Sequence, residues 1–257
     1  MTIATMSTNS RTSTIQPEQR TAARIVGLLY LVQMATGVFG EIVARGRLIV
    51  PSDATRTAQN IIAGERLFRL SIAGDLLTYI GVIVLIWAFY VLVRPVSRNL
   101  ALLAVLFRLA ENAVLCVATI NSLVMLKLLS GADYLKTFDT GQRNALVMLA
   151  YSTQGLAMSV GFILLGLGST VFACLLLKSR YVPKALAALG IFASLLLSIS
   201  TLAIIVFPDL AAVSMACMIP MGLYEVGLGL WLLIKGITAP AVNSHLSTLI
   251  PQPSTSR

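Results

Sequence analysis

The sequence predicts an all-α fold, a polytopic transmembrane helical bundle of six spans with both termini in the cytoplasm. Of its 257 residues, 57% are hydrophobic and only 11% are charged, whereas a soluble domain carries about a quarter charged residues. The apolar runs are continuous and rich in Leu, Ile, Val and Ala, whereas outer-membrane barrel strands alternate apolar and polar residues. The composition therefore excludes a soluble domain, and the pattern favours helices over a barrel.

Six apolar runs are long enough to cross a hydrocarbon core of about 30 Å, which takes about 20 helical residues. They cover residues 25–43, 68–93, 100–126, 155–177, 185–207 and 211–234. Backbone groups inside lipid must be hydrogen-bonded within the protein, so each run is expected to be a helix. A single membrane domain over residues 22–236 follows.

The segments outside this domain are polar. Residues 1–21 are rich in Ser and Thr and are expected to form a disordered cytoplasmic tail. Residues 237–257 contain Pro, Ser and Thr and are expected to form a flexible C-terminal tail.

Basic residues set the expected orientation. The net charge is +9, from 19 Lys and Arg against 10 Asp and Glu. The short loops after the second and fourth runs carry Arg94, Arg98, Lys178, Arg180 and Lys184. Short cytoplasmic loops are enriched in Lys and Arg, so these loops and both termini are expected inside.

An amphipathic outer segment is expected at residues 52–66. Ser52 and Asp53 are suitable N-caps, and Ala58, Ile61 and Ile62 share one helical face. The helix could be a strap resting on lipid headgroups or a lid over an outward cavity. A second stretch, residues 138–154, could lie on the surface or extend the fourth spanning helix. Both pairs of alternatives remain open.

A candidate polar layer lies near the middle of the membrane. Its members are Gln33, Arg108, Glu111, Asn112 and Glu225. Gln33, Arg108, Glu111 and Glu225 lie 9 to 12 residues from the residues that flank the inner ends of their runs, Arg24, Asn99 and Lys235, which is about 14 to 18 Å. Each charge at this depth costs about 2.5 to 3.5 kcal/mol. The layer is interpreted as a buried ion-pair network, a substrate, ion or proton site, or a catalytic centre.

A direct ion pair between Arg108 and Glu225 is predicted within this layer, because the two residues lie at similar depth. Gly222 and Gly229 flank Glu225 on its helix, so another backbone could approach closely there.

A second group of polar residues is expected nearer the outer surface, as a candidate outer vestibule. It contains Glu41, Asp75, Asn121 and Gln154. The simpler alternative for Asp75 is an interfacial carboxylate that is solvated by headgroups or paired with Arg69 or another outer cation.

Motifs of enzymes are nearly absent. The single histidine, His245, lies in the C-terminal tail, and Cys116, Cys174 and Cys217 lie on different runs. This pattern offers neither a His-based triad nor a metal-ligand set, so no catalytic residue, metal or cofactor is predicted.

The Arg and Glu layer suggests a small-solute or proton-linked transporter or a ligand binder, with the bilayer and a small molecule or proton as partners. A non-catalytic accessory or assembly protein is the alternative.

Several strings carry a family resemblance. VPSDA at 50–54, RPVSRNLALLA at 94–104 and FRLAE at 107–111 occur in this order, preceded by ARIVGLLYL at 23–31. Over residues 22–236 the chain resembles the bacterial membrane family called domain of unknown function 4386. The resemblance implies a six-helix protein of the bacterial cytoplasmic (inner) membrane. It implies no activity, and no functional residue is carried over from it.

Overall fold

The computed structural model describes residues 15–238, without the side chains of residues 211–215. Across these residues the chain forms helices and connecting turns, and no strand is present. Six of the helices are long and apolar enough to cross a membrane. The prediction of an all-α bundle with six spans is confirmed.

The spanning helices extend beyond the apolar runs. They are α1 (Pro17–Val38), α4 (Glu65–Val93), α5 (Arg98–Leu129), α6 (Thr140–Ser179), α7 (Lys184–Val206) and α8 (Ala211–Ile234). The first span continues from α1 through a π-helical turn, η1 (Phe39–Arg45), into α2 (Gly46–Leu48). The short elements α3 (Ala54–Ala63), η2 (Asp133–Thr137) and η3 (Pro208–Leu210) connect the spans.

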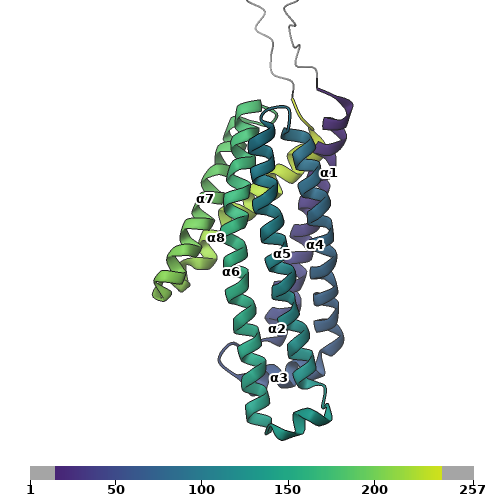
Figure 1. The fold of residues 1–257 in the computed structure, drawn as a ribbon, viewed down its shortest axis with the longest axis vertical. Helices are drawn as coiled ribbons and strands as arrows, with labels where there is room; N and C mark the ends of the chain where they lie inside the picture. Colours follow the sequence, from purple (N-terminus) through teal and green to yellow (C-terminus); the bar gives the residue numbers. More distant parts are fainter. Residues whose placement is uncertain (1–14, 239–257) are drawn as a thin grey trace, which may run out of the picture.

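The spanning helices form a ring in chain order. α1 packs against α4, and the pairs α4 and α5, α5 and α6, α6 and α7, and α7 and α8 follow, with α8 returning to α1. Figure 1 shows that α1 begins and α8 ends at the same end of the bundle, here called the terminal end. The opposite end, crossed by α3, is called the α3 end.

Helix α1 begins earlier than the sequence suggested. Pro17 occupies the first helical position, and the side chains of Gln16 and Gln19 cap each other's backbone N–H groups. Gln19 is buried and donates a hydrogen bond to the Tyr181 hydroxyl at 2.9 Å. Residues 17–21 of the expected tail are therefore helical. Residues 1–14 and 239–257 of the two expected tails lie outside the described residues.

Residues 140–154 extend α6 and do not form a separate surface helix. The Asp139 carboxylate accepts a hydrogen bond from the Gln142 N–H at 2.8 Å, and Gln142 Oε1 accepts one from the Asp139 N–H at 3.0 Å. This capping box starts a helix of 40 residues, which is about 60 Å long.

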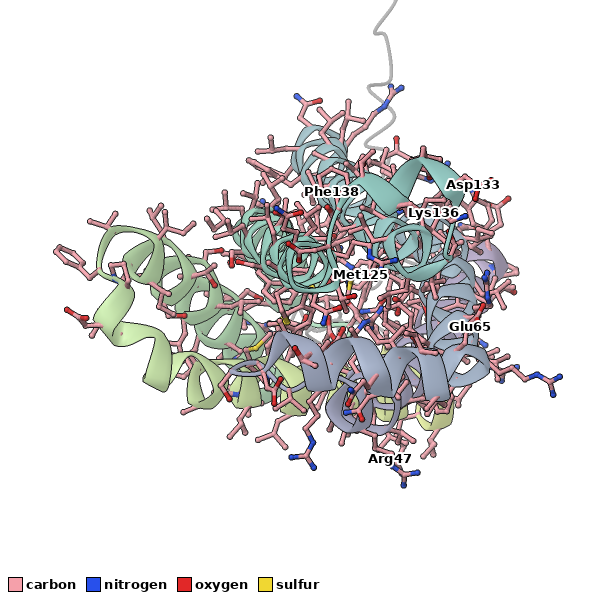
Figure 2. All side chains as sticks on the ribbon, turned by 90° about the horizontal axis from the view of Figure 1, so that it is seen from below. Arg47, Glu65, Met125, Asp133, Lys136 and Phe138 are labelled. Carbon is pink, nitrogen blue, oxygen red and sulfur yellow. The ribbon has the colours of Figure 1, made fainter. Side chains whose placement is uncertain are left out.

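The predicted amphipathic segment forms α3, which is shorter than residues 52–66. Asp53 caps its first turn by accepting from the Arg56 N–H at 2.8 Å, and Gly64 ends it. The buried face of α3, with Ala58 and Ile61, packs on the ends of α4, α5 and α6. Figure 2 shows α3 lying across this end of the bundle, with Glu65 at the rim.

Buried apolar side chains form two separate clusters. The cluster nearer the terminal end includes Phe89 and Phe172, whose stacked rings have centroids 4.2 Å apart. The cluster at the α3 end includes Ile61, Phe68 and Met125. On α4, α5 and α6, the segments between the two clusters contain polar residues, so the apolar core is interrupted in the middle of the bundle.

Helices α1 and α8 pack closely near the terminal end. A Cβ atom on Gly27 would lie 2.7 Å from both the Gly229 carbonyl oxygen and the Leu233 nitrogen, so the two backbones touch there. This contact confirms the close approach expected at Gly229. Further along, a Cβ on Gly222 would meet only the Met34 methyl group, at 3.9 Å. The two helices diverge from the glycine contact, as the inclined path of α8 in Figure 1 shows.

Candidate functional site

A cavity of about 570 Å³ lies inside the ring of helices, between the two apolar clusters. All six spanning helices and η1 contribute to its wall. Its polar lining residues are Gln33, Glu41, Asp75, Thr78, Tyr79, Glu111, Asn112 and Glu225. The cavity therefore brings together members of both predicted polar groups.

The buried end of the cavity contains Gln33, Glu111, Asn112 and Glu225. Glu225 is 6% exposed, and Glu111 and Asn112 are each 4% exposed. The Asn112 amide donates a hydrogen bond to the Tyr79 carbonyl oxygen at 3.2 Å, which fixes the orientation of that amide. Gln33 Oε1, Asn112 Oδ1 and Glu225 Oε1 are buried and accept no hydrogen bond from the described residues. This end is therefore lined by acceptors that lack donors.

Arg108 lies behind this end and does not line the cavity. Its Nη1 atom is 3.0 Å from Glu111 Oε2 on the same helix, and the residue is 1% exposed. Its aliphatic stem packs on Gly168, where an added Cβ would lie 2.9 Å from Arg108 Cγ. The guanidinium thus neutralises Glu111 while the stem closes the contact between α5 and α6.

The predicted ion pair between Arg108 and Glu225 is wrong. Among the described residues, the ion pair of Arg108 is with Glu111, and no Arg108 nitrogen lies within 4.0 Å of a Glu225 carboxylate oxygen. Residues three apart on a helix share a face, which makes the local pair geometrically easy. Equal depth places two residues at one height but does not set the direction in which each side chain points.

The end of the cavity nearer α3 has a second charged group, formed by Glu41, Arg45 and Asp75. Arg45 Nη1 lies 2.8 Å from Glu41 Oε1, and Arg45 Nη2 bonds to Asp75 Oδ2. The Arg45 side chain is 5% exposed, whereas that of Glu41 is 49% exposed. Arg45 thus holds carboxylates from two helices together beside the exposed end of the cavity.

Backbone geometry positions this group. Glu41 and Arg45 both belong to the π-helical turn η1, a feature that is frequent at functional sites. A Cβ on Gly40 would lie 3.2 Å from Asp75 Oδ1 and 3.3 Å from Arg45 Nη1, so glycine leaves room for the pair. Asp75 is therefore paired with another cation and not with Arg69, whose partner is Glu65 at 2.7 Å.

Two members of the predicted outer vestibule lie elsewhere. Gln154 accepts a hydrogen bond from the Ser122 hydroxyl at 2.7 Å, which links α6 to α5. Asn121 donates to the Ala118 carbonyl oxygen of its own helix at 3.2 Å. Neither side chain lines the cavity.

Sequence reasoning missed several residues of the site. Arg45 lies beyond the apolar run at residues 25–43, so hydropathy does not mark it, although its spacing of four residues from Glu41 is a usable signal. The apolar wall includes the methionines Met34, Met158, Met218 and Met221. Methionine is flexible and adapts its shape to a neighbouring molecule. No sequence signal separates these methionines from others that face lipid.

Comparison with curated proteins and with solved structures gives no match. The family model described as Domain of unknown function (DUF4386) matches residues 25–236. The matched region includes every residue that lines the cavity. The chain therefore belongs to this family of unknown function, as the strings VPSDA, RPVSRNLALLA and FRLAE indicated.

Proposed function

We propose that this membrane protein binds an amphiphilic small molecule in the cavity, as a ligand-binding protein or as a small-solute transporter. The main observation behind this proposal is that the cavity combines an apolar wall with buried hydrogen-bond acceptors that have no donor among the described residues. Buried polar atoms in proteins are nearly always hydrogen-bonded. A volume of about 570 Å³ falls within the range usual for small-molecule sites, about 300 to 1,000 Å³.

Access from the exposed end supports the same proposal. Val38 and Ile42 line the cavity and are 45% and 67% exposed, in contrast to the buried Glu225. Both lie on the first span, where α1 and α8 have diverged. A molecule with an apolar body could therefore enter between these helices with its polar group leading.

The alternative is a non-catalytic accessory protein in which the polar residues only hold helices together. The Arg108–Glu111 ion pair and the Ser122–Gln154 hydrogen bond favour it, because both partners of each contact belong to the protein. It leaves the acceptors on Gln33, Asn112 and Glu225 unexplained. The two functions differ in one observable, which is saturable binding inside the cavity.

Photolabelling tests the proposed function without knowledge of the natural ligand. The probe is 1-octanol with a diazirine on its chain, added to the protein in lipid nanodiscs. We expect saturable labelling of cavity residues such as Met34 and Met221, suppressed by excess unlabelled octanol. Lipid-facing Leu223, which is 63% exposed, provides the control and should be labelled without saturation. Labelling confined to such lipid-facing positions would contradict the proposal.

We also propose that the protein lies in the bacterial cytoplasmic membrane with both termini in the cytoplasm. The basic loops that contain Arg94, Arg98, Arg180 and Lys184 lie at the terminal end of the bundle (Figure 1). The positive-inside rule then places α3 and the exposed end of the cavity on the extracytoplasmic side.

Reporter fusions test this orientation. Alkaline phosphatase fused after residue 97 or after residue 181 should be inactive, because both positions are expected in the cytoplasm. A fusion after residue 131, in the turn between α5 and η2, provides the control and should be active. High phosphatase activity from either of the first two fusions would overturn the orientation.

A further inference from the structure

The charged residues that line the cavity all carry the same sign. They are Glu41, Asp75, Glu111 and Glu225. Arg45 neutralises part of the exposed group, and Arg108 is paired with Glu111. Among the described residues, no cationic side chain lies within 4.0 Å of Glu225. Glu225 is therefore the carboxylate at the buried end that lacks a cation.

Three buried hydrogen-bond acceptors at this end have no donor among the described residues. Gln33 Oε1, Asn112 Oδ1 and Glu225 Oε1 are acceptors without donors. They come from α1, α5 and α8, so a donor group in the cavity would join three helices. An alkylammonium group has three N–H donors and one positive charge, which matches three acceptors that include one unpaired carboxylate.

The charged and titratable neighbours of Glu225 fit a single positive charge. Arg108 and Glu111 on α5 and Tyr30 on α1 face it, and Tyr224 precedes it on α8. Arg108 and Glu111 carry opposite charges and offset each other. When Glu225 is ionised, one negative charge is left, and burying it without a cation is costly.

The rest of the cavity wall indicates that the ligand has a hydrocarbon body and is not a bare metal ion. It is formed by Met34, Val38, Ile42, Val82, Leu115, Met158, Phe162, Leu165, Leu197, Met218 and Met221. Contact with such a wall stabilises an alkyl or aryl chain by about 0.8 kcal/mol per buried CH₂ group.

We propose that the ligand is a hydrophobic primary amine, bound as its ammonium ion among Gln33, Asn112 and Glu225 with its hydrocarbon body along the methionine-rich wall. The inference rests on the proposed function and adds the chemical class of the ligand. Glu225 is the counter-ion in this site, and the two amide oxygens complete the contacts to the ammonium group.

Equilibrium dialysis against protein in nanodiscs of zwitterionic lipid tests the inference. The probes are octylammonium, 1-octanol and octanoate, with protein-free nanodiscs as the blank for partitioning. We expect octylammonium to bind tighter than octanol by about tenfold or more, which is the gain from one charge-assisted hydrogen bond. Octanoate should bind weakest, since the unpaired carboxylate of Glu225 repels an anion at the buried end.

Matched variants assign the preference to the site. Glu225→Gln should remove the preference for octylammonium over octanol, whereas Glu65→Gln, on a carboxylate 51% exposed at the bundle end, should keep it. If Glu225→Gln fails to fold, Gln33→Met provides the second variant. It removes an acceptor that has no donor and should weaken octylammonium binding while leaving octanol binding unchanged.

The outcomes separate the two proposals. Saturable binding of octanol and octylammonium with equal affinity would overturn the ammonium site and leave the proposed function standing. A preference that persists in both Glu225→Gln and Gln33→Met would also overturn it. Absence of saturable binding for all three probes would overturn both proposals.

Discussion

Replacing Arg108 with leucine is expected to lower the free energy of unfolding by about 3 to 5 kcal/mol. Arg108 is 1% exposed and is the cation paired with Glu111. Its removal leaves the carboxylates of Glu111 and Glu225 buried in the same region without a nearby positive charge. The packing of its stem on Gly168 is also lost. SDS-induced unfolding in mixed micelles measures the change.

A double-mutant cycle identifies the partner of Arg108. Because Glu111 contacts Arg108 directly, Arg108→Leu combined with Glu111→Leu should cost clearly less than the sum of the single changes. The exposed pair of Arg69 and Glu65 provides the control, since its side chains are 60% and 51% exposed and its coupling should stay below about 1 kcal/mol. Additive effects for Arg108 and Glu111 would contradict the role of this pair.

Hydrophobic patterning was sufficient to predict the six spans and the amphipathic helix before the second span. Long apolar runs have one stable solution in lipid, which is the helix. The ends of the helices were harder to predict, because capping and not hydropathy sets them. Asp139 and Gln142 start α6 well before residue 155, and Gln16, Pro17 and Gln19 start α1 before residue 22.

The positions of the polar residues were also predicted only in part. Counting along each run predicted that Gln33, Glu111 and Glu225 lie at one depth, and all three line the cavity. Counting residues gives neither the rotation of a helix about its axis nor its tilt. The partner of Arg108 was therefore mispredicted. Arg45 was missed because the first apolar run ends at Val43, whereas the π-helical turn continues to Arg45.

Filling the cavity should abolish binding without unfolding the protein. Gly37 and Gly222 line the cavity, and a Cβ at Gly37 would meet no atom within 4 Å. Leucine at either position adds four heavy atoms to the space that the ligand would occupy. Because glycine is a poor helix former, the substitution should leave the unfolding free energy unchanged or raise it by up to about 1 kcal/mol.

Gly155→Leu is the matched control for these variants. Gly155 lies on α6, is exposed, has no atom within 4 Å of its Cβ position and does not line the cavity. It introduces the same side chain into a spanning helix but leaves the cavity volume unchanged. A loss of binding in this variant would point to a general effect of the substitution.

The central claim is that the cavity around Glu225 and Glu111 is a ligand site. Saturable binding of octylammonium to the Gly37→Leu, Gly222→Leu and Gly155→Leu variants in nanodiscs tests it most directly. The structure predicts that Gly37→Leu and Gly222→Leu lose saturable binding while Gly155→Leu retains the affinity of the unmodified protein. Equal binding to all three variants would contradict the claim.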